Sequence, residues 1–255
     1  MKRYKVFIDP GHGEKDTGAA GYGVVEKNIN LSVSIQLKNL LLEDERFEVK
    51  LSRESDAYIN INARAKLAND WNPDIVISKH HNSAAAKEAR GAEVLCSVVG
   101  GDSLRLGKAI LYEYEKIQTL RPTPIIQKWN SAKTADYYGI IRQTKAPAVI
   151  TEFCFLSNKE DAAKVNTLTK TLEQAKADYG AILKYFNLEE MKKREVRYKT
   201  LKEVPAGEFH DTIKKLINKG IIKGYSGSGE NTVVDLSADM VRMFVINNRA
   251  GVYNL

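Results

Sequence analysis

Two histidines and a glutamate of this chain follow apolar runs that are typical of buried strands. His12 lies in the loop that ends one such run, His80 comes shortly after another that ends at Ser78, and Glu152 follows the run Ala148–Thr151. Sheet enzymes place their chemistry at the ends of strands, so we expect these side chains to meet at one edge of a sheet. A carboxylate that ends an apolar strand is costly to bury unless it is paired, protonated or near a metal.

This set of residue types suits a metal-dependent hydrolase. Such a site takes three ligands from His, Asp, Glu or Cys, keeps one position open for water, and needs a separate carboxylate to move protons. The chain contains four histidines, so the choice of imidazole ligands is narrow. His80 and His81 are adjacent, and on a strand their side chains point to opposite faces, so at most one of them joins the site.

Structural alternatives remain open at this point. The loop Asp9-Pro10-Gly11-His12-Gly13 also fits a tight turn with no ligand role. Glu26 lies at the start of a predicted helix, where a glutamate commonly favours the helix macrodipole. From the residues alone, Glu152 carries the strongest signal of the group.

Strands and helices alternate along the part of the chain that holds these residues. Helical spacing predicts helices that begin near Lys27 and others over 60–69, 103–117 and 168–186. Apolar or alternating runs predict strands over 3–8, 47–51, 74–78, 91–96 and 148–151. This rhythm indicates an α/β fold, with helices on both faces of a layered sheet.

Four ordered motifs make the sequence recognisable. They are Asp9–Gly13 with Asp16–Ala19 and Glu26–Leu31, then Arg64 with Ala68-Asn69, then Ile77–Ser83, and finally Thr151–Asn158. In this order they resemble the zinc-dependent N-acetylmuramoyl-L-alanine amidases of the type-3 family. The resemblance implies a twisted, mostly parallel six-stranded sheet flanked by helices. Two positions depart from the family pattern, because His81 replaces a small residue and Cys154 replaces a frequent glycine.

The resemblance also implies a site and a reaction. His12, Glu26 and His80 match the zinc ligands, and Glu152 matches the residue that takes a proton from water and passes it to the leaving nitrogen. The implied reaction is hydrolysis of the amide between N-acetylmuramic acid and L-alanine in bacterial peptidoglycan. A polymeric substrate needs an open groove, for which we expect the following wall residues: His81, Ser83, Tyr137 and Phe155.

Composition shifts after the last predicted helix. We expect the catalytic domain to cover 1–187, a charged linker to cover 188–206, and a small helical module to cover 207–255. The module resembles a single surface-layer-homology repeat, as found in some clostridial phage lysins. The resemblance implies that it binds a secondary cell-wall polymer or a second copy of itself.

Charge and hydropathy limit the partners. The formal charge of +7 is spread over interspersed acidic and basic residues, so no nucleic-acid-binding stripe is visible. No apolar run reaches 18 residues, so we expect no membrane insertion, and no signal peptide is apparent. We therefore expect a protein made in the cytoplasm that reaches the wall after holin-type release, as a phage endolysin does, or after mother-cell lysis.

Two other functions are compatible with parts of the sequence. Cys154 with a histidine base would make a cysteine-type peptidoglycan amidase, which requires an exposed thiol. A wall-binding protein that retains the fold without catalysis is the second alternative. The presence of all four expected functional residues argues against it.

Overall fold

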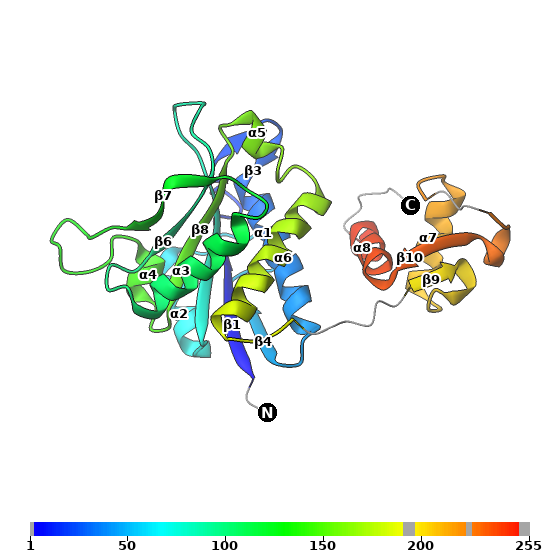
Figure 1. Cartoon of the computed structure of the whole chain (residues 1–255), viewed down its shortest axis with the longest axis horizontal. Helices are drawn as coiled ribbons and strands as arrows, with labels where there is room; N and C mark the ends of the chain where they lie inside the picture. The colour runs from blue at the N-terminus through cyan, green and yellow to red at the C-terminus, as the bar shows by residue number, and fades with distance from the viewer. Residues whose placement is uncertain (1–2, 191–196, 223–225, 250–255) are drawn as a thin grey trace. The chain divides into compact units, whose positions relative to one another are not determined.

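A six-stranded sheet forms the centre of the first 190 residues (Figure 1). The structure is a computed structural model that describes residues 3–190, 197–222 and 226–249, and the chain divides into unit 1 (1–190) and unit 2 (191–255). The elements of unit 1 are β1 (Tyr4–Pro10), β2 (Ala20–Gly21), β3 (Val24–Val25), α1 (Glu26–Leu42), β4 (Phe47–Leu51), α2 (Ile61–Trp71), β5 (Ile75–Asn82), β6 (Ala92–Cys96), α3 (Gly101–Tyr114), β7 (Leu120–Gln127), α4 (Gly139–Gln143), β8 (Ala148–Phe155), α5 (Lys159–Ala162) and α6 (Leu168–Tyr185).

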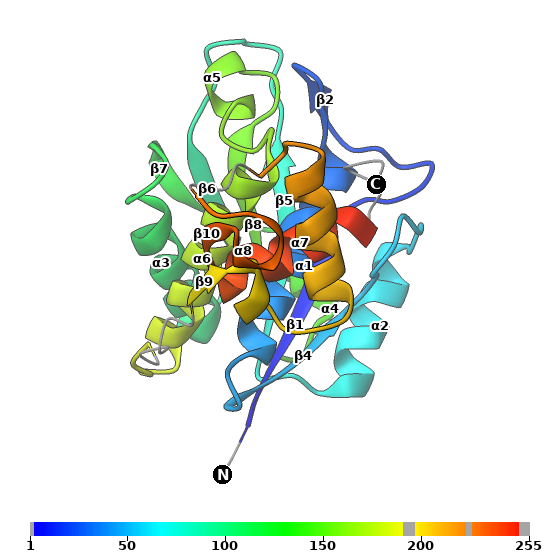
Figure 2. The same ribbon diagram turned by 90° about the vertical axis from the view of Figure 1, so that its right-hand side faces the viewer.

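The strand order of the sheet is β4-β1-β5-β8-β6-β7. Neighbouring strands are parallel except β6, which runs antiparallel to β8 and parallel to β7. The predicted α/β fold with a mostly parallel six-stranded sheet is therefore confirmed. In Figure 2, β2 and α5 lie at the upper end of unit 1, opposite the end at which β1 begins.

Helices cover both faces of this sheet. One core contains the inward residues of α1, α3 and α6, such as Leu37, Ile110 and Ile182, and the other contains residues of α2 and α4, such as Ala68 and Ile140. Side chains alternate between these two cores along each central strand. Within the described residues, no helix combines the length and the apolar composition needed to cross a bilayer.

Strand β7 was not predicted from the residue pattern. It contains Pro122 and Pro124, which cannot donate to a neighbouring strand, and it occupies an edge of the sheet. Proline is tolerated in a sheet mainly at such an edge. The two prolines therefore explain both why the residue pattern did not predict β7 and why β7 lies at an edge of the sheet.

A buried ion pair joins β5 to the helices behind it. Lys79 Nζ lies 2.7 Å from both Asp178 Oδ2 and the hydroxyl oxygen of Tyr114, and that hydroxyl donates to Asp178 Oδ1 at 2.7 Å. Lys79 and Asp178 are fully buried. Burial lowers the pKa of Lys79, and the opposing charge of Asp178 limits that effect. The three side chains satisfy one another inside the core.

Unit 2 combines helices with a small sheet. Its elements are β9 (Arg197–Thr200), the 3-10 helix η1 (Leu201–Glu203), α7 (Glu208–Asn218), the 3-10 helix η2 (Gly229–Asn231), β10 (Val233–Ser237) and α8 (Ala238–Arg249). β9 and β10 pair antiparallel, and the unit has its own apolar core: Leu201, Val204, Ile213, Leu216, Ile222, Val234, Leu236 and Val241.

This arrangement corrects the expectation of a purely helical module. Residues 197–203, which we assigned to the linker, form β9 and η1 and contribute Leu201 to the core of unit 2. Ser237 caps α8 as expected, because its hydroxyl accepts from the backbone nitrogen of Met240 at 3.2 Å. Parts of the expected linker and turn, 191–196 and 223–225, lie outside the described residues.

Candidate metal centre

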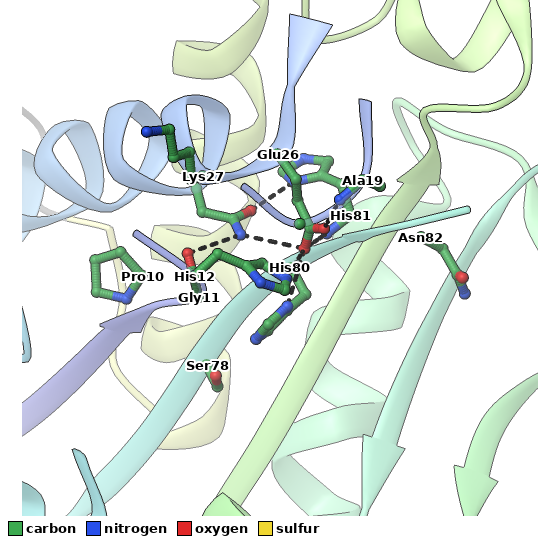
Figure 3. Close-up of polar contacts among 12 residues, drawn as sticks. Pro10, Gly11, His12, Ala19, Glu26, Lys27, Ser78, His80, His81 and Asn82 are labelled. Atoms are coloured by element: carbon green, nitrogen blue, oxygen red, sulfur yellow. Dashed lines mark hydrogen bonds and ion pairs between the residues drawn. The ribbon is translucent and has the colours of Figure 1, made fainter. Parts of the chain in front are cut away.

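His12, Glu26 and His80 direct their side chains toward one another (Figure 3). Glu26 Oε1 lies 3.0 Å from His12 Nε2 and 2.9 Å from His80 Nδ1. One ligand atom from each residue lies within 4.8 Å of the other two. Ligand atoms of a tetrahedral zinc ion, with bonds of 2.0 to 2.1 Å, are about 3.3 Å apart, so this donor set fits zinc. The structure therefore brings together the three residues that the sequence analysis selected.

Three elements deliver these side chains to one edge of the sheet. His12 follows β1, Glu26 is the first residue of α1, and His80 lies near the end of β5. Two glycines let the surrounding backbone approach closely. A Cβ at Gly11 would lie 2.3 Å from the His80 ring, and one at Gly18, whose φ is +65°, would lie 2.4 Å from Glu26 Oε2. Any larger residue at either position would displace a candidate ligand, His80 or Glu26.

Two arginines hold the loop that carries His12. The φ angle of His12 is 62°, a left-handed conformation that costs a non-glycine residue on the order of 1–3 kcal/mol. Arg64 donates to the His12 carbonyl at 2.7 Å and forms an ion pair with buried Asp9 at 2.6 Å. Arg53 donates to the Gly11 carbonyl at 2.9 Å. These contacts fix the direction of the imidazole.

Neighbouring polar groups orient the candidate ligands. Asp16 Oδ1 lies 2.8 Å from His12 Nδ1, which leaves Nε2 directed at Glu26. Asn30 donates to Glu26 Oε1 at 3.3 Å, and the Ala19 backbone donates to Glu26 Oε2 at 2.8 Å. Such outer contacts orient metal ligands in many proteins. Asn30 was not predicted as a site residue, although its spacing of four residues from Glu26 places both on one face of α1.

The electrostatics of the cluster favour an ionised Glu26. Burial raises the pKa of this carboxyl group, but hydrogen bonds and charge from His12 and His80 outweigh burial and hold the pKa well below its usual range. The pKa of His12 is raised, because its contacts with Glu26 and Asp16 outweigh the opposite effect of burial. The cluster thus holds an anionic oxygen between two imidazoles.

Glu152 lies beside this cluster. It is the β8 residue in register with His80 on β5, so the two side chains share a face of the sheet. Burial raises the pKa of Glu152 well above its usual range, and the charges of Glu26 and Glu93 add to the effect. Its Oε2 is buried and has no hydrogen-bond partner among the described residues. A carboxyl group in this environment can accept a proton and release it again.

Two of the four expected groove residues are not on the surface. His81 is 1% exposed, and its ring nitrogens face Asn30 (2.7 Å) and Gln174 (3.2 Å), because it points to the opposite face of β5 from His80. Burial lowers the pKa of His81 to about 4, which keeps the imidazole neutral. Phe155 is 4% exposed. The expectation that these two side chains line a groove is therefore wrong.

The other two expected groove residues are accessible. Ser83 is exposed directly after β5, and Tyr137 is exposed on the segment between β7 and α4. Both remain candidates for substrate contact.

Cys154 does not have the surroundings of a nucleophile. Its side chain is fully buried, and burial together with the charge of Asp161 raises the pKa of the thiol well above its usual range. A reactive cysteine needs an accessible thiolate. The cysteine-type alternative therefore loses its main requirement.

Comparisons with known proteins identify a family and a fold. The sequence profile described as N-acetylmuramoyl-L-alanine amidase matches residues 6–184. The N-acetylmuramoyl-L-alanine amidase CwlM of Bacillus licheniformis is 31% identical over 185 residues, which are 72% of this chain and 69% of that protein. The endolysin of Bacillus phage SPP1 is 35% identical over 162 residues, which are 62% of this chain and 57% of that protein.

A solved structure of an N-acetylmuramoyl-L-alanine amidase from Clostridium difficile 630 shares the fold. It aligns with a TM-score of 0.66 and 26% identity, over 74% of this chain and 100% of that chain.

Proposed function

The chain belongs to the N-acetylmuramoyl-L-alanine amidase family, and from this premise we propose that it is a zinc-dependent peptidoglycan hydrolase with Glu152 as the general base. The bond cut is the amide between N-acetylmuramic acid and the L-alanine of the stem peptide. The observation that carries the proposal is the convergence of His12, Glu26 and His80 beside Glu152, whose Oε2 is buried.

The donor set supports zinc as the resident metal. Two imidazoles and one carboxylate resemble the ligand sets of catalytic zinc sites, which leave a fourth position open. When bound there, zinc would act as a Lewis acid that makes water nucleophilic near neutral pH. Asp16 and Asn30 keep His12 and Glu26 in the orientation that such a site needs.

Glu152 supplies the proton transfer in this proposal. It takes a proton from the attacking water and donates one to the departing L-alanine nitrogen. Its raised pKa suits this task, because a carboxyl group with an ordinary pKa would return a proton less readily. The leaving nitrogen, and hence the peptide, lies on the Glu152 side of the candidate ligands in this arrangement.

Mass spectrometry of digested peptidoglycan tests the activity. Amidase cleavage should release peptides that begin with L-alanine and leave intact glycan, and a chelator should stop the release. New reducing sugar ends would instead identify a glycosidase. Digestion that persists after complete metal removal would contradict the zinc mechanism.

We also propose that the chain acts as a phage endolysin, with unit 2 as a surface-layer-homology-like module that docks to a wall polymer or to a second copy of itself. Similarity to the SPP1 endolysin supports the biological role. Unit 2 exposes apolar side chains, including Ile221 (47%), Met240 (38%) and Ile246 (44%), which a partner could cover. Sedimentation of a fusion of residues 191–255 to a fluorescent protein, with and without purified walls, distinguishes wall binding from self-association. A fusion that does neither would contradict this role.

A further inference from the structure

Two polar side chains extend the candidate site across the sheet onto β6 and β7. Glu93 on β6 is in register with Glu152 on β8, which is in register with His80 on β5. Arg121 at the start of β7 places Nε 3.0 Å from Glu93 Oε2. His80, Glu152 and Glu93 therefore form a row on one face of three adjacent strands, and Arg121 ends it.

Two irregularities in strand pairing bring partners to Glu93. Ala92 of β6 pairs with Leu120 of β7, and the next pair is Val94 with Ile125. Two residues of β6 therefore lie opposite five residues of β7, so β7 bulges at this point. Arg121 lies in that extra segment of β7. A second register shift, between β5 and β8, follows His80, and there Asn82 donates to Glu93 Oε1 at 2.8 Å. Bulges next to active sites commonly redirect side chains in this way.

The Glu93 and Arg121 pair remains accessible. The Arg121 side chain is 35% exposed and that of Glu93 is 13% exposed. The Arg121 guanidinium group lies over the Phe155 ring, 5.1 Å from the ring centre, in a cation–π contact. The pair thus presents a fixed acceptor next to a fixed donor, at the side of Glu152 away from the candidate metal ligands.

An uncharged carboxamide fits this pair better than a carboxylate. Its N–H can donate to Glu93 while its carbonyl accepts from Arg121. A carboxylate offers only acceptor atoms, so it could accept from Arg121 but would face the Glu93 oxygens with no N–H to donate. Leaving a charged group unpaired in such a site is strongly unfavourable.

The position of the pair corresponds to the second residue of the stem peptide. Two strand spacings separate β5 from β6, which is about 9–10 Å. A peptide advances about 3.3–3.6 Å per residue, so a group on the second residue beyond the scissile amide reaches this distance. This step rests on the proposed function, in which the peptide leaves on the Glu152 side.

We propose that Glu93 and Arg121 form a subsite for an uncharged carboxamide on the second residue of the stem peptide, and that this subsite selects against a carboxylate at that position. Phe155 and Asn82 hold the pair in place. The enzyme accordingly prefers amidated peptidoglycan.

Two soluble muropeptides test the proposal. They carry the same disaccharide and tripeptide and differ only in whether the second residue bears a carboxamide or a carboxylate. The wild-type chain should cleave the carboxamide form with a kcat/KM about tenfold higher or more. Glu93→Gln, which removes the charge, should reduce this ratio to near one. Arg121→Gln should raise KM for the carboxamide form with little change in kcat, because the lost contact is to a group remote from the scissile bond.

Glu113→Gln is the matched control. Glu113, near the end of α3, pairs with Lys116 just after that helix, and the Glu113 side chain is 16% exposed, close to the value for Glu93. Its substitution should leave the ratio unchanged. Equal cleavage of both muropeptides by the wild type, or an equal loss on both in folded Glu93→Gln, overturns the subsite and leaves the amidase function intact. Failure of the wild type to cleave either muropeptide or intact peptidoglycan overturns the proposed function and the subsite with it.

Discussion

Replacing Asp178 by asparagine tests how much the buried ion pair behind the candidate site stabilises unit 1. Lys79 and Asp178 are both fully buried and lie 2.7 Å apart. Asparagine keeps the shape of the side chain but removes its charge, so the ammonium group of Lys79 is left uncompensated. Breaking a buried pair in this way costs about 3–5 kcal/mol, and we expect a loss of that size in the free energy of unfolding.

Tryptophan fluorescence measures this loss in unit 1 alone. The chain has two tryptophans, Trp71 and Trp129, and both lie in unit 1. For a domain of this size, 1 kcal/mol shifts the melting temperature by about 2–4 °C, so the expected decrease is about 6–20 °C. Urea titration should show a lower midpoint with an unchanged slope.

Asp70→Asn is the control for this experiment. Asp70 pairs with Lys66 on the surface of α2, where both side chains are more than half exposed, and such pairs contribute little to stability.

A pH series adds a second check. Without Asp178, burial lowers the pKa of Lys79 further below its unfolded value, so the folded state binds fewer protons and its stability should rise with pH. A loss in Asp178→Asn no larger than that in the control would refute the reasoning.

Four further predictions concern the site and the units. Glu152→Gln should retain metal but lower kcat on soluble muropeptides by about 10²–10⁴-fold, and an unchanged kcat would contradict its role in proton transfer. His80→Ala should lose its zinc in elemental analysis while folded His81→Ala keeps it, and the reverse result would reassign the ligand. Cys154→Ser should retain most activity and full sensitivity to a chelator, whereas resistance to the chelator with loss of activity would favour a cysteine hydrolase. Residues 1–190 alone should cleave soluble fragments at the full rate but intact walls up to about 100-fold more slowly, as a dye-release assay would measure, because tethering is lost.

Much of unit 1 follows from local sequence patterns. The central strands read as apolar runs because they are covered on both faces, and the motifs around His12, Glu26 and His80 predict the convergence that the structure shows. The opposite directions of His80 and His81 also follow from the two-residue repeat of a strand. The central strands and the opposite directions of His80 and His81 depend on residues close together in the chain, whereas the convergence of His12, Glu26 and His80 was implied by the resemblance of four ordered motifs to a known family.

The features that escaped prediction depend on partners far away in the chain. In the sequence, Glu93 is one polar residue in a predicted strand and nothing marks it as part of a site. In the fold, β8 places Glu152 beside it and the bulge in β7 places Arg121 beside it. Likewise, β9 is short and polar, and only its pairing with β10 makes it a strand. Such pairings set by distant segments leave no local periodicity to read.

Successive side chains of Lys79–Asn82 alternate between the protein interior and the candidate site. Lys79 and His81 contact α1, α3 and α6, while His80 belongs to the candidate metal centre and Asn82 donates to Glu93. A one-residue insertion or deletion in β5 would exchange these two sets, so that the core groups would face the candidate metal centre and the His80 imidazole would be buried on the opposite face. We therefore expect the chain to tolerate a change of length in the exposed residues 85–88 beyond the strand, and to tolerate only substitutions within β5.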